Sequence, residues 1–77
     1  MDINGYIENF AAQLDETPAD QITAETKFRD LEEWSSLIAL SIIAMADEEY
    51  SVTLKGDDIK NAETVQDLFN AILAKKQ

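Results

Sequence analysis

Residues 34–50 read WSSLIALSIIAMADEEY, and this stretch decides the fold of the chain. Apolar residues recur in it three and four positions apart, which is the spacing of one face of an α-helix. The face predicted to be buried consists of Ala39, Ile42, Ile43, Ala46 and Tyr50. A second apolar set lies off that face and consists of Leu37, Leu40, Ala44 and Met45, with Ser41 and Glu48 among them. Because a small domain rarely buries a helix on all sides, this second set is either additional core or a surface for a partner.

Two serines, Ser35 and Ser36, stand where this helix begins. A serine at that place commonly accepts a hydrogen bond from a free backbone N–H group of the first turn. We therefore expect one of the two to cap the helix. The other hydroxyl is then displayed at the helix start, where it would be available for modification. Position alone does not choose between a capping and a functional role, since serines before helices are common.

The residues before residue 34 predict one helix and one long loop. Apolar residues at helical spacing run from Ile3 to Leu14, and Asp2 is the expected cap. Pro18 disfavours helix in the residue before it, so the pattern ends near Thr17. Residues 16–35 are then expected to form an ordered loop with a short helical turn near residues 20–23. The loop is expected to be held to the core by Phe28 and Leu31.

The residues after residue 50 predict an extended link and two further helices. Residues 52–54 lack a helical period, and residues 57–61 allow one short helical turn. Thr64, with Asp67 three residues later, is a capping pair for a last helix that ends in Lys75 and Lys76. The apolar face of that helix is Val65, Leu68, Phe69, Ile72 and Leu73. The fold class expected is therefore all-α: a small four-helix bundle of three main helices and one short one, formed by residues 1–77 as one domain.

The composition excludes several classes of function. The 77 residues contain no cysteine and no histidine, so the chain has no disulfide, no thiolate metal site and no Ser-His or Cys-His catalytic pair. Its 16 acidic and 6 basic residues give a net charge of −10. Such a chain repels nucleic acid and anionic membranes and attracts basic protein surfaces. No targeting segment and no membrane-spanning run are recognised, so a soluble cytoplasmic protein is expected.

Two acidic clusters raise the question of a metal site. They are Asp57-Asp58 and Asp47-Glu48-Glu49. Neither has the alternating oxygen ligands and the glycine of a calcium loop. We interpret both as solvated faces and expect no metal site and no enzymatic activity.

The order of these features resembles the acyl carrier protein family over nearly the whole chain. The resemblance rests on the helix order, the loop sequence Phe28-Arg29-Asp30-Leu31, the acidic end of the central helix and the segment Thr64-Val65-Gln66-Asp67-Leu68. The signature of the family is Asp-Ser-Leu, whose serine carries 4′-phosphopantetheine. The corresponding residues here are Ser35-Ser36-Leu37, so the resemblance implies covalent attachment at Ser36.

The resemblance also implies a mode of action. Ser36 would be the passive substrate of a phosphopantetheinyl transferase that uses coenzyme A, and the arm would supply the thiol that the chain lacks. The protein would be a monomeric carrier rather than an enzyme, and it would serve acyl-loading and acyl-processing enzymes with basic docking patches. The implied partner surface is Leu37, Ile38, Leu40, Ser41, Ala44, Asp47 and Glu48. The implied lining of an acyl cavity is Phe28, Ile42, Ile43, Ala46, Tyr50, Leu54, Ile59 and Leu68.

The chain departs from the family pattern around the serine. Ser35 replaces the aspartate of the signature, Trp34 replaces a small residue, and Glu32-Glu33 replaces the leucine-glycine of fatty-acid carriers. Ile38 and Ser41 stand where those carriers have acidic residues. These departures indicate a specialised carrier with its own partner enzymes. The cargo, whether fatty acyl, polyketide or aminoacyl, stays open.

One alternative function and one local alternative remain. An acidic helical domain with an exposed apolar stripe is also typical of a non-covalent interaction or inhibitor module, which needs no modified serine. Trp34 either holds the loop to the core or lies against the arm or a partner.

Overall fold

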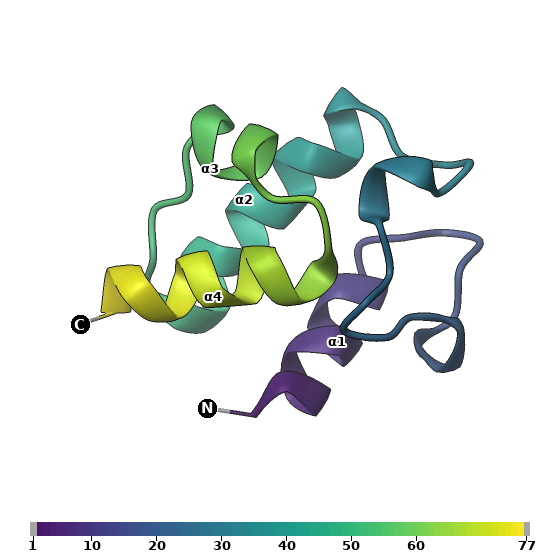
Figure 1. The fold of residues 1–77 in the computed structure, drawn as a ribbon, viewed down its shortest axis with the longest axis horizontal. Coiled ribbons are helices and arrows are strands. Elements are labelled where there is room, and N and C mark those ends of the chain that lie inside the picture. Colours follow the sequence, from purple (N-terminus) through teal and green to yellow (C-terminus); the bar gives the residue numbers. More distant parts are fainter. Residues whose placement is uncertain (1, 77) are drawn as a thin grey trace.

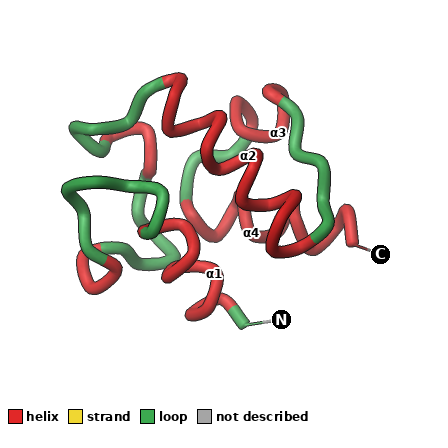
Figure 2. Tube along the Cα trace, turned by 180° about the vertical axis from the view of Figure 1, so that it is seen from behind, coloured by secondary structure: helices red, strands yellow, loops and turns green. Residues whose placement is uncertain are grey.

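The computed structural model describes residues 2–76 and contains four α-helices. They are α1 (Ile3–Ala11), α2 (Ser36–Tyr50), α3 (Gly56–Asn61) and α4 (Val65–Lys76), with 3-10 turns at Ala19–Gln21 and Phe28–Asp30. No strand occurs among the described residues, so the predicted all-α bundle with one short helix is confirmed. In Figure 1, α2 passes behind α3 and α4, and α1 lies on the side of the long connection. Figure 2 shows that connection as the most extensive loop region, beside α1.

The buried face of α2 is rotated relative to the sequence expectation. Ile42, Met45 and Ala46 are the buried residues of this helix, whereas Ile43 and Tyr50 are half-buried. Met45, which lay off the predicted face, is therefore additional core, the first of the two alternatives for its set. Met45 lies one helical turn after Ile42 and so shares its face, and neighbours α1 and α4 both contact α2 and widen the buried arc.

Aromatic side chains join α1, α4 and the long loop. The ring of Tyr6 lies 5.0 Å from that of Phe69, and the ring of Phe10 lies 6.2 Å from that of Phe28. Phe28 is 0% exposed, which confirms its predicted role in holding the loop to the core. Such ring pairs contribute stability beyond the burial of their area.

Backbone hydrogen bonds fasten the long loop to the start of α4. The N–H of Val65 donates to the carbonyl of Thr26 at 2.9 Å, and the N–H of Gln66 donates to the carbonyl of Ala24 at 2.9 Å. The guanidinium of Arg29 donates to the carbonyl of Ile59 at 2.8 Å, where α3 ends. These contacts order a loop that has little regular secondary structure of its own.

Local capping sets the helix boundaries. The carboxylate of Asp2 accepts from the N–H of Asn4 at 3.2 Å, as predicted. Thr64 and Asp67 exchange hydrogen bonds of 3.1 Å each, which confirms the predicted capping pair. By contrast, α1 ends at Ala11, earlier than its apolar pattern, although Leu14 is still buried.

The hydroxyl of Tyr6 has no hydrogen-bond partner within residues 2–76, although the side chain is fully buried. Burial raises the pKa of this hydroxyl above its ordinary range, so it stays neutral. A buried polar group without a partner costs about 1–3 kcal/mol. We therefore expect Tyr6→Phe to raise the free energy of unfolding by about 1 kcal/mol, measured by urea denaturation.

Tyr50→Phe is the matched control for this prediction. The hydroxyl of Tyr50 accepts a hydrogen bond of 3.0 Å from the side-chain amide of Asn9. Removing the same atom there should lower the free energy of unfolding by about 1 kcal/mol. Equal effects of the two substitutions would contradict the assignment of an unpartnered hydroxyl to Tyr6.

Two carboxylates at helix starts are held by backbone N–H groups. The N–H of Lys55 donates to Asp58 at 2.8 Å, and this bond chiefly lowers the pKa of Asp58, with a further contribution from Lys75 at 3.3 Å. The pKa of Asp67 is lowered first by the backbone N–H of Glu63 and then by that of Thr64, each of which donates to its carboxylate at 3.1 Å. A lowered pKa means that the folded state binds the proton more weakly than the unfolded chain.

Stability should therefore fall on acidification. The contribution of Asp58 and Asp67 is present above the ordinary aspartate pKa of about 4 and is lost as the pH drops through the lowered values. We expect Asp58→Asn with Asp67→Asn to flatten the curve of unfolding free energy against pH below about pH 4. Asp57→Asn is the control, since it removes the same charge from the first turn of α3 without removing either of these bonds. An unchanged slope in the double variant would refute the assignment.

Candidate functional site

The two serines before and at the start of α2 have different environments. Ser35 has an extended backbone, and its Oγ accepts from the N–H of Ile38 at 3.4 Å. Ser35 is therefore the cap of the helix. Ser36 is the first residue of α2 and is exposed, and no hydrogen bond to its hydroxyl is found within residues 2–76.

The surroundings of Ser36 suit an anionic ester. The first turn of α2 contains no acidic residue. The free N–H groups and the positive end of the helix dipole favour a negative charge at this place. Since Ser35 is neutral, no carboxylate precedes Ser36 directly in the sequence. The start of α2 would thus favour the negative charge of a phosphodiester on the Ser36 oxygen.

An exposed face of α2 extends from Ser36 toward the C-terminal end of the helix. Leu37 is 75% exposed and Leu40 is 61% exposed, and among residues 2–76 these are the exposed large apolar side chains. Ala44, Asp47 and Glu48 are also exposed, and Ser41 is half-buried. The face is apolar near Ser36 and acidic near the end of the helix. Ile38, predicted to share this surface, is half-buried and packs against the core.

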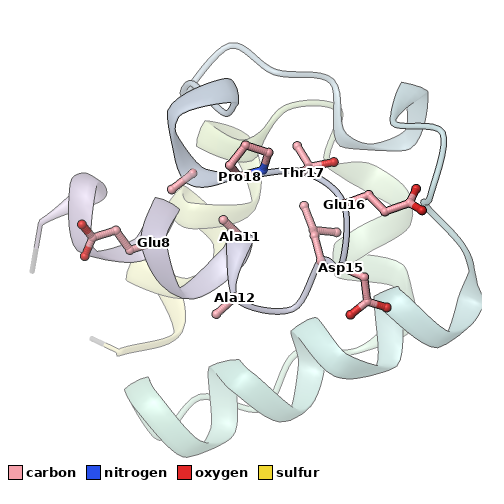
Figure 3. A pocket seen from close by; sticks show the side chains of 9 residues that line it. Glu8, Ala11, Ala12, Asp15, Glu16, Thr17 and Pro18 are labelled. Carbon is pink, nitrogen blue, oxygen red and sulfur yellow. The ribbon is translucent and has the colours of Figure 1, made fainter.

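The residues predicted to line an acyl cavity lie in and around the packed core. Ile43 and Tyr50 are half-buried, and the buried members are Phe28, Ile42, Ala46, Leu54, Ile59 and Leu68. A hollow of about 400 Å³ lies between the end of α1 and the following turn. Figure 3 shows the side chains that line it. Ala11, Ala12 and Pro18 line it, and none of the eight predicted residues does. A space for cargo near Ser36 therefore stays a prediction.

The acidic clusters of the sequence do not converge into a metal site. Among residues 2–76, no group of three or more carboxylates is arranged to hold a metal ion. Asp58 instead accepts the N–H of Lys55 and pairs with Lys75. The described part of the chain also contains no helix long and apolar enough to cross a membrane.

Glu33 has a role that was not predicted from the sequence. Its two carboxylate oxygens accept the N–H groups of Asp15 and Glu16, each at 2.8 Å. The neighbouring Trp34 stacks parallel to Phe10, with ring centres 6.4 Å apart, and is part of the core margin. Of the two roles considered for Trp34, the structure therefore shows packing against the core. The bonds of Glu33 have no local sequence signal, because they join residues 17 and 18 positions apart.

Comparison with known proteins identifies the class. Residues 6–72 match the family described as "Phosphopantetheine attachment site". The chain is 36% identical to an acyl carrier protein of Kineococcus radiotolerans over 65% of this chain and 62% of that protein. It is 32% identical to an acyl carrier protein of Thermobifida fusca over 86% of this chain and 87% of that protein. No solved structure matches the chain significantly.

The chain therefore belongs to the acyl carrier protein family, which confirms the resemblance read from its sequence. Its covalent cofactor is 4′-phosphopantetheine. When bound, this group supplies a terminal thiol, which is the functional group that a chain without cysteine lacks.

Proposed function

We propose that this protein carries acyl or related carboxylic intermediates as thioesters on 4′-phosphopantetheine attached to Ser36, and that it passes them between partner enzymes. The division of roles between the two serines is the observation that carries this proposal. Ser35 is engaged as the helix cap, while the neighbouring Ser36 hydroxyl is exposed at the positive end of α2. The matching of residues 6–72 to a phosphopantetheine attachment site supports it.

The chain supplies the attachment site for the cofactor and does not itself catalyse the attachment. The chain has no histidine, which is the usual general base for activating a serine. We therefore propose that a separate phosphopantetheinyl transferase activates Ser36. The Ser36 oxygen supplies the ester linkage, and the N-terminal end of α2 favours the negative charge of the phosphate. Ser35 keeps the first turn ordered through its bond to Ile38.

The exposed face of α2 is the proposed docking surface. Leu37 and Leu40 would enter an apolar groove on a partner, as exposed apolar residues at an interface centre commonly do. Asp47 and Glu48, at the other end, would pair with Arg or Lys of a basic patch. The net charge of −10 would speed these encounters at low salt.

The composition of this face supports a specialised carrier. Ile38 and Ser41 occupy positions that are acidic in fatty-acid carriers, so the half of α2 next to Ser36 presents fewer charges to a basic partner. Standard fatty-acid synthase enzymes should therefore turn over the acylated protein poorly compared with a fatty-acid carrier. Efficient turnover by them would overturn this part of the proposal.

Intact mass spectrometry tests the proposed function. The purified protein is incubated with coenzyme A and a phosphopantetheinyl transferase of broad specificity. The expected result is the addition of one 4′-phosphopantetheine per chain. An unchanged mass, with a known carrier modified in a parallel reaction, would refute the proposal and favour the non-covalent interaction module.

A further inference from the structure

The loop in front of Ser36 is fastened by a carboxylate that uses both of its oxygens. Oε1 of Glu33 accepts the N–H of Asp15, and Oε2 accepts the N–H of Glu16, each at 2.8 Å. A hydrogen bond to an ionised group is stronger than one between neutral groups. The two N–H groups lie beyond the end of α1 at Ala11 and make no helical bonds of their own. Glu33 thus satisfies two neighbouring donors at once.

The negative charges around Glu33 oppose its contact with the turn after α1, so the contact must be stabilised by its two hydrogen bonds. Glu33 approaches two residues that are themselves acidic, in a chain of net charge −10. Like charges repel one another. The carboxylate is nevertheless directed at the backbone of Asp15 and Glu16 rather than at a cationic side chain. Figure 3 shows the side chain of Asp15 on the turn after α1. The backbone N–H of this residue is one of the two that donate to Glu33.

The next residue attaches the same loop a second time. The ring of Trp34 stacks on that of Phe10 of α1 with an interplanar angle of 6°, and it lies 4.8 Å from the ring of Phe28. The N–H of Trp34 also donates to the carbonyl of Leu31 at 3.0 Å. Two consecutive residues are thus fixed to α1, to the turn after it and to the core, and only Ser35 separates them from Ser36.

We infer that Glu33 and Trp34 form a clasp that fixes the loop before Ser36 and positions its hydroxyl for the transferase. This inference rests on the proposed function of Ser36. A free loop loses conformational entropy when it docks, and that loss weakens binding. A loop that is already fixed loses less. Glu33 is a positioning residue here, since it acts through the backbone and touches neither coenzyme A nor the reacting oxygen.

The neighbouring glutamates allow a matched test. Glu33→Gln removes one charge and one acceptor oxygen from the clasp, while Glu32→Gln makes the same chemical change at an exposed position. We expect Glu33→Gln to raise the transferase KM for the apo protein about tenfold. This is the effect of a tenfold smaller fraction of molecules whose loop is in the conformation that the transferase binds. The kcat should stay nearly unchanged, because the serine and its surroundings are intact. Glu32→Gln should change neither constant.

Amide hydrogen exchange, followed by NMR on the unmodified protein, provides a readout independent of the transferase. Exchange at Asp15 and Glu16 should be about tenfold faster in Glu33→Gln and unchanged in Glu32→Gln. Exchange at Ile42, in the core, distinguishes this local opening from general loss of the fold. A wild-type protein that is never modified would refute the proposed function without affecting this measurement.

Two outcomes would overturn the inference. Equal exchange at Asp15 and Glu16 in both variants would show that Glu33 does not hold the turn. Faster exchange with an unchanged KM would show that the clasp exists but does not position Ser36.

Discussion

Replacing Ser36 with alanine is expected to abolish modification by coenzyme A and a phosphopantetheinyl transferase completely. The substitution removes the one oxygen proposed to form the ester, and the neighbouring serine cannot replace it. The hydroxyl of Ser35 is directed at the N–H of Ile38, and its backbone is extended rather than helical. Intact mass after the transferase reaction measures the result.

Ser35→Ala is the counterpart, because it deletes the same atom one residue earlier. This variant should still gain one 4′-phosphopantetheine. It should lose about 0.5–2 kcal/mol of unfolding free energy, because the first turn of α2 loses its cap. Comparing the two variants therefore distinguishes the serine that carries the cofactor from the serine that caps the helix. A modified Ser36→Ala protein, or a Ser35→Ala protein that is folded but unmodified, would assign the two roles the other way round.

Phe28→Ala is expected to have the largest effect on stability. Phe28 is fully buried, and its ring contacts those of Phe10 and Trp34. Truncating such a residue costs about 3–5 kcal/mol, since its burial is lost and a cavity remains. Small domains are stable by only about 5–15 kcal/mol, so this loss should bring the protein close to unfolding. Urea denaturation followed by circular dichroism measures it.

Leu37→Ala is the control for this substitution. Leu37 is 75% exposed, so shortening it should change the free energy of unfolding by less than about 0.5 kcal/mol. The same variant is expected to weaken partner binding if Leu37 belongs to the docking surface. A small effect of Phe28→Ala would mean that the long loop is not held by its aromatic contacts.

The loop between α1 and α2 links these predictions. Phe28 holds its middle to the core, and Glu33 with Trp34 holds its end in front of Ser36. Destabilising the middle should therefore also disturb the presentation of the serine. Modification of Phe28→Ala at low temperature, where more of it is folded, would test this link through a higher transferase KM.

Local patterns in the sequence by themselves determined most of the secondary structure. A helix is stabilised by contacts three and four residues apart, so its apolar period and its caps are readable from the chain. The ends of α2 and the capping pair at Thr64 and Asp67 were predictable for this reason. The missing cysteine and histidine likewise excluded whole classes of chemistry before any fold was known. The Ser-Ser-Leu step, combined with the length, acidity and helix order of the chain, pointed to the family to which the chain belongs.

Only the tertiary structure decided which side of α2 is buried and how the loop is held. Met45 is in the core because α1 and α4 both pack on α2, whereas the helical spacing alone left its set as either core or partner surface. The bonds of Glu33 to Asp15 and Glu16 and the stacking of Trp34 on Phe10 join residues far apart in the chain. Such contacts depend on the path of the whole chain, because a side chain's partner is set by what folding brings beside it. The spacing of residues along the chain does not predict these partners.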